Sequence, residues 1–220
     1  MKTLIACALA VLIAAPLAAQ TGRPATSSAE DTPKLSLRPF FVATEESFAA
    51  KTTFKAAFGQ SMEPFFGAGA QLSMRNGVFV EVGASRFRKS GQRAFVSNGQ
   101  TFQLGIPLTA TITPFEITAG YRFGASKSRR VIPYAGVGVG RYSYQETGDA
   151  AADGDNVDTH HSGYLAVGGV EFRVHRWIAL SADAQYTRVP GILGAGGVSQ
   201  DAGETDLGGI AARFKVLVGR

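Results

Sequence analysis

From Lys34 onward, apolar residues recur at every second position, and this period of two constrains the fold more than any other feature of the sequence. In the stretch GYLAVGGVEFRV, residues 163–174, Ala166 and Phe172 share one parity, whereas Glu171 falls on the other. Successive side chains of a β-strand point to opposite faces, so this alternation predicts a strand with one apolar and one polar face. No window shows sustained helical spacing, and the sequence therefore predicts an all-β domain.

Eight segments of this kind follow one another along the chain. They span residues 35–45, 65–74, 78–85, 107–123, 132–145, 163–174, 177–189 and 207–218. Long and short connections alternate between them, and one long connection contains the run RKSGQRAFVSNGQTFQLG. Bacterial outer-membrane barrels have an even number of strands, short periplasmic turns and long extracellular loops. The pattern predicts an eight-stranded antiparallel transmembrane β-barrel with meander topology, a filled lumen and periplasmic termini.

Two segments depart from a simple alternation. In the fourth, the apolar parity changes between residues 108–112 and residues 115–123. A β-bulge shifts parity by one residue and tolerates proline, so we expect a bulge at Thr113–Pro114. In the fifth, Val137 shares its parity with Arg141 while glycines occupy the other. The sequence leaves the two faces of this segment unassigned.

The chain begins with MKTLIACALAVLIAAPLAAQ, a positive residue followed by an apolar run and a small-residue cleavage site. This pattern predicts a secretory signal peptide over residues 1–19. Residues 20–33 are polar, contain proline and lack periodicity, so we expect a disordered leader there and an outer-membrane barrel over residues 34–220. Cys7, the only cysteine, lies in the signal peptide, so the mature chain is expected to have no disulfide and no thiol site.

Charged side chains on the minor face of the predicted strands are mixed in sign. They are Arg38, Glu81, Glu116, Arg122, Glu171, Arg173, Asp183, Arg213 and Lys215. In a soluble barrel this face would meet water, whereas in a membrane it would line the lumen. Side chains fill the interior of an eight-stranded barrel, and a buried charge is costly unless it is paired. The near balance of signs favours a structural ion network in the lumen over a soluble periplasmic ligand-binding barrel.

Aromatic residues near the segment ends, on the apolar parity, also favour a membrane location because such residues form girdles at membrane interfaces. They are Tyr121, Phe123, Tyr142, Tyr144, Tyr164 and Tyr186. Beyond the signal peptide no apolar run approaches 18 residues, which excludes a helical membrane protein. The net charge of +5 is mild and dispersed, so no nucleic-acid partner is expected.

The runs PLTATITPFEITAGYRF, VIPYAGVGVGRYSYQE, SGYLAVGGVEFRV and DLGGIAARFKVLVGR resemble the outer-membrane β-barrel superfamily that includes OmpA-like and OmpX-like small barrels and the opacity-type proteins. The resemblance covers about residues 34–220. It implies eight antiparallel strands, insertion by the barrel-assembly machinery and no fixed chemistry. The chain ends in VLVGR where the family has a terminal phenylalanine as its assembly signal, and Phe214 could serve in its place.

Few residues are of types that commonly bind metal ions or take part in catalysis. His160 and His161 lie in a predicted loop beside the acidic stretch 153–158, and these residue types can bind a metal ion. The histidines and aspartates do not have the spacing of a known metal-binding motif, and the stretch lacks the glycine and distal glutamate of a calcium loop. A solvated polar loop is therefore favoured. Ser162 adjoins His161, but neighbouring strand residues point to opposite faces. We therefore expect no catalytic residue, no metal and no cofactor.

The function expected from these features is a structural, adhesive or surface-interaction role without enzymatic activity. The expected partners are outer-membrane lipid, the assembly machinery during insertion and an extracellular ligand at the long loops, because loops carry function more often than scaffolds do. The chain is expected to be a monomer. The alternative is a narrow porin-like passage or a carrier for small apolar molecules.

Overall fold

A computed structural model describes residues 35–97, 100–124, 129–148, 157–194 and 197–219, so the predicted signal peptide and leader lie outside the described residues. In chain order the elements are β1 (Leu35–Phe48), α1 (Lys51–Phe58), β2 (Met62–Met74), β3 (Val78–Ser97), β4 (Gln100–Arg122), β5 (Val131–Thr147), β6 (Val157–His175), β7 (Ile178–Arg188), α2 (Gly197–Asp201) and β8 (Gly209–Val218).

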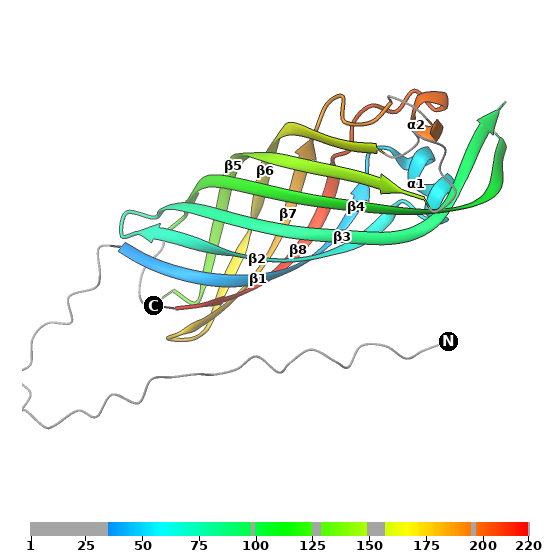
Figure 1. Ribbon diagram of the computed structural model, residues 1–220. Helices are drawn as coiled ribbons and strands as arrows, with labels where there is room; N and C mark the ends of the chain where they lie inside the picture. Colours follow the sequence, from blue (N-terminus) through cyan, green and yellow to red (C-terminus); the bar gives the residue numbers. More distant parts are fainter. Residues whose placement is uncertain (1–34, 98–99, 125–128, 149–156, 195–196, 220) are drawn as a thin grey trace, which may run out of the picture. The chain divides into compact units, whose positions relative to one another are not determined.

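The eight strands form one closed barrel in which each strand pairs with its neighbours in sequence (Figure 1). Closure is made by antiparallel pairing of β1 with β8, in a register that places Phe41 opposite Val216. A closed ladder leaves no strand edge unpaired, which a sheet in a bilayer requires. The predicted all-β, eight-stranded antiparallel meander is confirmed.

The outer wall of the barrel is apolar along most of its length. Its large exposed side chains include Leu37, Phe41, Phe66, Phe115, Ile117, Val137, Val139, Phe172, Ile210 and Phe214. Val137 and Val139 settle the faces of β5, because both point outward while Gly136 and Gly138 line the interior. The outward parity of every strand therefore provides a surface that matches lipid.

Glycine is used where aromatic rings fill the lumen. A Cβ added at Gly69 would lie 2.5 Å from Cζ of Phe40, and one added at Gly120 would lie 2.5 Å from Cζ of Phe79. Both rings are almost fully buried. The missing side chains on β2 and β4 thus make room for rings that come from neighbouring strands, which explains part of the high glycine content.

The prediction of a bulge at Thr113–Pro114 is wrong. Pairing of β4 with β5 runs without a shift from Thr109 to Arg122, and the irregularity between β3 and β4 lies between Gln92 and Ala94. Leu108 and Ile112 have the same parity as Arg122, so their side chains also point into the lumen. The apolar parity changes because this part of the lumen is itself apolar.

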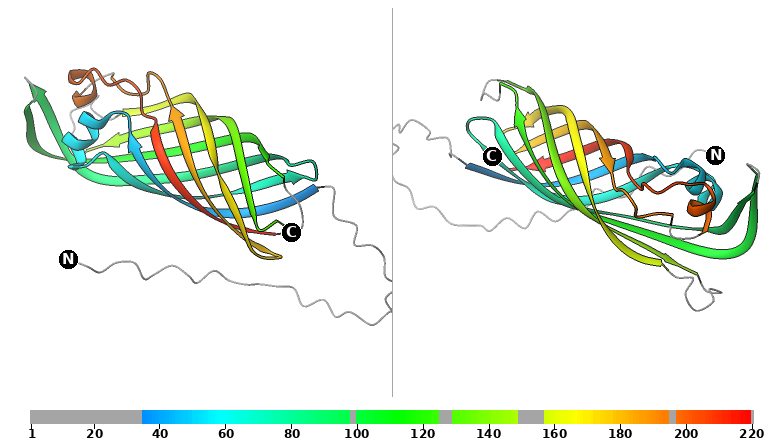
Figure 2. Two further views of the ribbon diagram at one scale, coloured as in Figure 1. Left: turned by 180° about the vertical axis from the view of Figure 1, so that it is seen from behind. Right: turned by 90° about the horizontal axis from the view of Figure 1, so that it is seen from above.

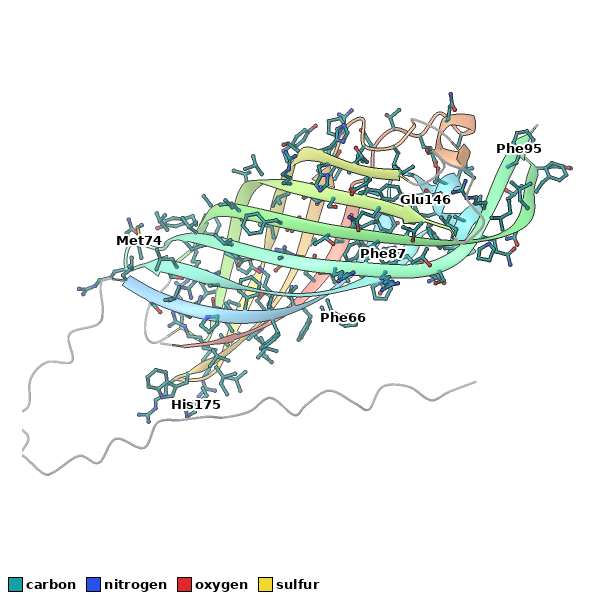
Figure 3. All side chains as sticks on the ribbon, in the orientation of Figure 1. Phe66, Met74, Phe87, Phe95, Glu146 and His175 are labelled. Carbon is teal, nitrogen blue, oxygen red and sulfur yellow. The ribbon has the colours of Figure 1, made fainter. Side chains whose placement is uncertain are left out.

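The long connection predicted between the third and fourth strands is also wrong. Residues 86–97 continue β3 and residues 100–106 begin β4, so only 98–99 separate the two strands. The resulting hairpin projects beyond the other strands and carries Phe95 near its tip (Figures 1 and 3). Polar residues on both sides of this extension concealed its strand character in the sequence.

Two short helices, which the sequence did not predict, lie together at the end of the barrel opposite to the C-terminus (Figure 2). We call this the capped end, and we call the opposite end, which holds the turns 75–77 and 176–177 and the described residues 123–124 and 129–130 between β4 and β5, the turn end. Neither helix in the described part of the chain is long and apolar enough to span a membrane.

Candidate functional site: a sealed lumen

Nearest the turn end, the lumen holds a carboxylate surrounded by arginines. Arg38 on β1 donates to both carboxylate oxygens of Glu171 on β6, at 2.9 and 2.7 Å. Arg122 on β4 donates to Glu171 at 2.6 Å, and Arg173 approaches it at 3.7 Å. Glu171 is 2% exposed, so its charge depends on these guanidinium groups. One carboxylate therefore ties three strands together across the lumen.

A second group of charges lies one layer deeper in the barrel. Arg213 on β8 donates to Asp183 on β7 at 2.5 Å, and Lys215 donates to Glu81 on β3 at 2.6 Å. Lys215 also lies 3.5 Å from Asp183, so the two pairs form one cluster. The ammonium group of Lys215 sits 5.3 Å from the ring centroid of Phe40, in the range of a cation–π contact.

Neutral polar side chains link the charged groups to one another. Gln71 accepts a hydrogen bond from Arg38 and donates to Glu81 at 3.3 Å, which joins the two layers. Tyr134 donates to Asp183, and Tyr142 donates to Glu116 at 2.6 Å. Buried charges are costly unless all of their hydrogen-bonding capacity is used, and these partners supply much of it.

The nine charged residues singled out in the sequence all lie on the luminal side of the wall. The structure brings together Arg38, Glu81, Glu116, Arg122, Glu171, Arg173, Asp183, Arg213 and Lys215 through the contacts above. Two of them are less enclosed. Glu116 is partly buried, 3.9 Å from Arg213, and Arg173 lies near the turn end with its side chain 31% exposed.

Several luminal polar residues were not recognised in the sequence. Glu63 on β2 is 2% exposed and accepts a hydrogen bond from Lys89 on β3 at 2.5 Å. Glu46 on β1 lines a cavity of about 40 Å³ together with Glu116 and Arg213. Glu46 and Glu63 both have the luminal parity of their strands, but they lie beyond the predicted segments. Correct prediction of where β1 ends and β2 begins would have identified both residues.

Above the charges, aromatic rings close the lumen at the capped end. Phe54 of α1 stacks on Phe48 of β1 with ring centroids 3.7 Å apart, and Phe87 packs against Phe65 at 5.3 Å. Ile112 and Tyr142 belong to the same buried cluster. The cavity beneath holds only a few water molecules by its volume. The lumen is therefore sealed by rings above and by ion pairs below.

The two loops that carry α1 and α2 are fastened to each other by a carboxylate. Glu204 accepts hydrogen bonds from the backbone amides of Thr52 and Thr53, at 2.9 and 2.8 Å, and from the Thr53 hydroxyl at 2.7 Å. Partial burial acts to raise the pKa of Glu204, but these hydrogen bonds outweigh it and hold the pKa below its usual range. The first turn of α1 thus depends on an ionised Glu204.

The six aromatic residues predicted to form the membrane-interface girdle fall into two groups in the structure. Tyr121, Phe123, Tyr164 and Tyr186 are exposed on the outer wall, where a girdle would lie. Tyr142 and Tyr144 are buried in the lumen instead, which corrects their assignment to the girdle. Their hydroxyl groups have luminal partners, Glu116 and Glu146 respectively, and this explains why tyrosine is tolerated inside.

The histidines lie on a strand rather than in a loop, because β6 begins at Val157. His160 is 3.7 Å from Asp158, and both side chains are well exposed, while His161 contacts Thr159 at 3.2 Å. Residues 153–156 of the acidic stretch lie outside the described residues. Among the residues that the structure describes, no three histidine, cysteine, aspartate or glutamate side chains are grouped as metal ligands would be.

Solved structures of small outer-membrane proteins have similar folds at low sequence identity. Ail of Yersinia pestis, in a complex with the heparin analogue sucrose octasulfate, aligns with a TM-score of 0.47 and 12% identity over 84% of this chain and 95% of Ail. Neisserial surface protein A aligns with a TM-score of 0.47 and 13% identity over 84% and 96%. OprG of Pseudomonas aeruginosa aligns with a TM-score of 0.45 and 11% identity over 84% and 92%.

A comparison with curated protein sequences finds no match. The family described as outer membrane protein beta-barrel domain matches residues 4–208, which is most of the chain. The match agrees with the closed eight-stranded barrel and its apolar outer wall. The chain belongs to this outer membrane protein beta-barrel family and is a small protein of the bacterial outer membrane.

Proposed function

We propose that this protein is a monomeric surface-interaction barrel with a structural or adhesive role and no enzymatic activity. The assembly machinery inserts it with the turn end in the periplasm and the capped end outside the cell, as short turns and longer connections are arranged in this kind of barrel. The observation that carries the proposal is the sealed lumen. Because the described side chains fill the lumen and leave no passage along it, the capped end is the part of the molecule that is available to a partner.

The projecting hairpin of β3 and β4 is the part of the capped end best suited to contact. Phe95 and Phe102 face each other across the two strands and are 47% and 49% exposed, and Leu104 is 55% exposed. Apolar side chains held beyond a protein's surface usually mark an interaction site. We infer that the extracellular ligand engages this tip rather than the barrel wall.

Adherence tests the role of the tip directly. Cells that display the chain should settle from suspension and adhere to polystyrene more than cells carrying the double variant Phe95→Ser, Phe102→Ser. A matched control replaces Thr101 and Gln103, polar neighbours on the same hairpin, by serine. Equal adherence of the wild type and the phenylalanine variant would show that the tip of the hairpin does not mediate adhesion.

A narrow passage is the competing function, and conductance separates it from the proposal. Purified protein in a planar bilayer should give no current steps above baseline, because Phe48 and Phe54 close one end of the lumen and the ion pairs close the other. Reproducible steps, or uptake of a small apolar solute into loaded vesicles, would favour the passage and count against a sealed barrel.

A further inference from the structure

At the turn end of the described barrel, basic side chains outnumber acidic ones. Exposed arginines lie between the strands there, and we call them the arginine rim: Arg75, Arg129, Arg130 and Arg176. Within the described residues, the carboxylate of this end is Glu171, which is already bound by Arg38 and Arg122. No described carboxylate forms an ion pair with any arginine of the rim.

The capped end has no comparable excess, because its basic residues are interspersed with acids. Arg188 donates to Asp206 at 2.9 Å, and Lys89 donates to Glu63 at 2.5 Å. Glu45, Glu146, Asp158 and Glu204 add further negative charge there. The asymmetry between the two ends is therefore a property of the folded molecule and not of the overall composition.

Two basic residues stand next to each other where β5 and β6 meet the turn end. The backbone amide of Arg173 donates to the carbonyl oxygen of Arg130 at 2.8 Å, so the two residues are neighbours across the strands. Like charges at such positions repel each other unless an anion lies close to both. Glu171 forms an ion pair with Arg173 at 3.7 Å, whereas no described carboxylate forms an ion pair with Arg130.

The arginine rim adjoins exposed apolar residues of the outer wall. Val131 follows Arg130 directly and Trp177 follows Arg176, and both are exposed on the outer wall. The guanidinium carbon of Arg176 is 5.9 Å from the ring centroid of Trp177. Tryptophan favours the membrane interface, so it fixes the level of the rim at the boundary between acyl chains and water.

We propose that the arginine rim binds the phosphate groups of acidic phospholipids in the leaflet around the turn end. Guanidinium groups bind phosphate oxygens in pairs, and uncompensated arginines at headgroup depth are placed to do so. With the orientation given under the proposed function this is the periplasmic leaflet. The lipid preference itself does not depend on that orientation, since it is set by the rim and not by the direction of insertion.

Trp177, the only tryptophan in the sequence, allows a direct measurement. The full chain is reconstituted in phosphatidylcholine vesicles that contain equal fractions of brominated phosphatidylglycerol or brominated phosphatidylcholine, and quenching of Trp177 is compared. The brominated phosphatidylglycerol should quench more strongly. The double variant Arg129→Gln, Arg130→Gln leaves Arg176 in place beside the indole and should lower the preference about fivefold per arginine, the equivalent of about 1 kcal/mol each.

The control variant Arg86→Gln, Arg88→Gln removes two exposed arginines from β3 near the capped end and should keep the wild-type preference. Each variant is first shown to be folded by its heat-dependent mobility on a gel. Equal quenching by the two lipids in the wild type, or an equal loss of preference in both double variants, would show the proposal to be wrong. So would binding of the wild type to purified peptidoglycan in place of any lipid preference, since the rim would then serve a different partner.

Discussion

Glu171 shows at the scale of one residue how the interior of this barrel is organised. Its carboxylate meets guanidinium groups from β1, β4 and its own strand at 2.7, 2.6 and 3.7 Å. Removing one partner of a buried ion pair leaves the others uncompensated, and that loss is larger than the net contribution of the pair. The residue is therefore more important for stability than a surface salt bridge would be.

We expect Glu171→Gln to lower the free energy of unfolding by about 3 to 5 kcal/mol, because it leaves Arg38 and Arg122 buried without a carboxylate. Urea titration in lipid vesicles, followed by the fluorescence of Trp177, measures the change. Glu45→Gln is the matched control, since Glu45 is exposed on the outer face of β1 and should change the stability by less than about 0.5 kcal/mol. Similar values for the two variants would exclude a structural role for the luminal network.

A second residue-scale prediction concerns the outer wall. Val170 lies on the outward parity midway along the apolar part of β6, and Val170→Arg should destabilise the barrel by about 2 to 4 kcal/mol. Ser162→Arg, on the same face of the same strand but beyond the apolar region, should cost about 0 to 1 kcal/mol. Equal costs in vesicle unfolding experiments would mean that the apolar surface does not lie in the bilayer.

The sequence could indicate which charges share a face but not where each strand ends. Parity alone was sufficient to single out Arg38, Glu171 and Asp183 as residues of one face. Glu46 and Glu63 were missed because the strands extend past the predicted segments. Tyr142 was misassigned because an aromatic ring at a strand end suits a membrane interface and a buried cluster equally well, and only the neighbouring rings decide between them.

At the scale of elements, β4 shows why a change of parity misled the prediction. Its luminal side chains are apolar from Leu108 to Ile112 and polar from Thr118 to Arg122, while the strand itself runs regularly. The aromatic cluster contributed by α1, β1 and β3 makes one end of the lumen apolar. That environment comes from distant parts of the chain, so no local pattern in β4 could reveal it.

The cap formed by α1 should respond to acid. The pKa of Glu204 is lower when the cap is folded than when it is open, so its contribution to stability is present at neutral pH and is lost as the pH falls through the lowered pKa. A spin label on Lys55→Cys should become more mobile at that pH. Glu204→Gln should show the mobile spectrum already at neutral pH, and an immobile label in this variant would contradict the role of the carboxylate.

At the scale of the whole molecule, the barrel and its cap are held by different forces. The barrel is closed by backbone pairing between β1 and β8, whereas the cap is held by packing of Phe54 and by the hydrogen bonds of Glu204. Backbone pairing in a closed ring does not depend on the loops that cross its mouth. The cap should therefore be removable without loss of the barrel.

Replacing residues 49–61 by a short turn tests this separation. The variant should still migrate differently on a detergent gel before and after boiling, as a folded barrel does, although its lumen would be open at one end. Because the ion pairs of Glu171 still close the other end, the variant should give no conductance steps, and steps would show that the cap alone seals the lumen. A variant with the same mobility before and after boiling would show that the barrel needs its cap to fold.

Two of the pairs in the luminal ion network join residues far apart in sequence, with a separation of 133 positions for Arg38 and Glu171 and of 134 for Glu81 and Lys215. While the chain is being assembled, Arg38 has no carboxylate until β6 arrives, and Glu81 has no ammonium group until β8 arrives. An incomplete sheet thus carries charges that the hydrocarbon core excludes. The last strand, β8, completes the ring and supplies Arg213 and Lys215 to Asp183 and Glu81, so the charges of the lumen are balanced only once the barrel is closed.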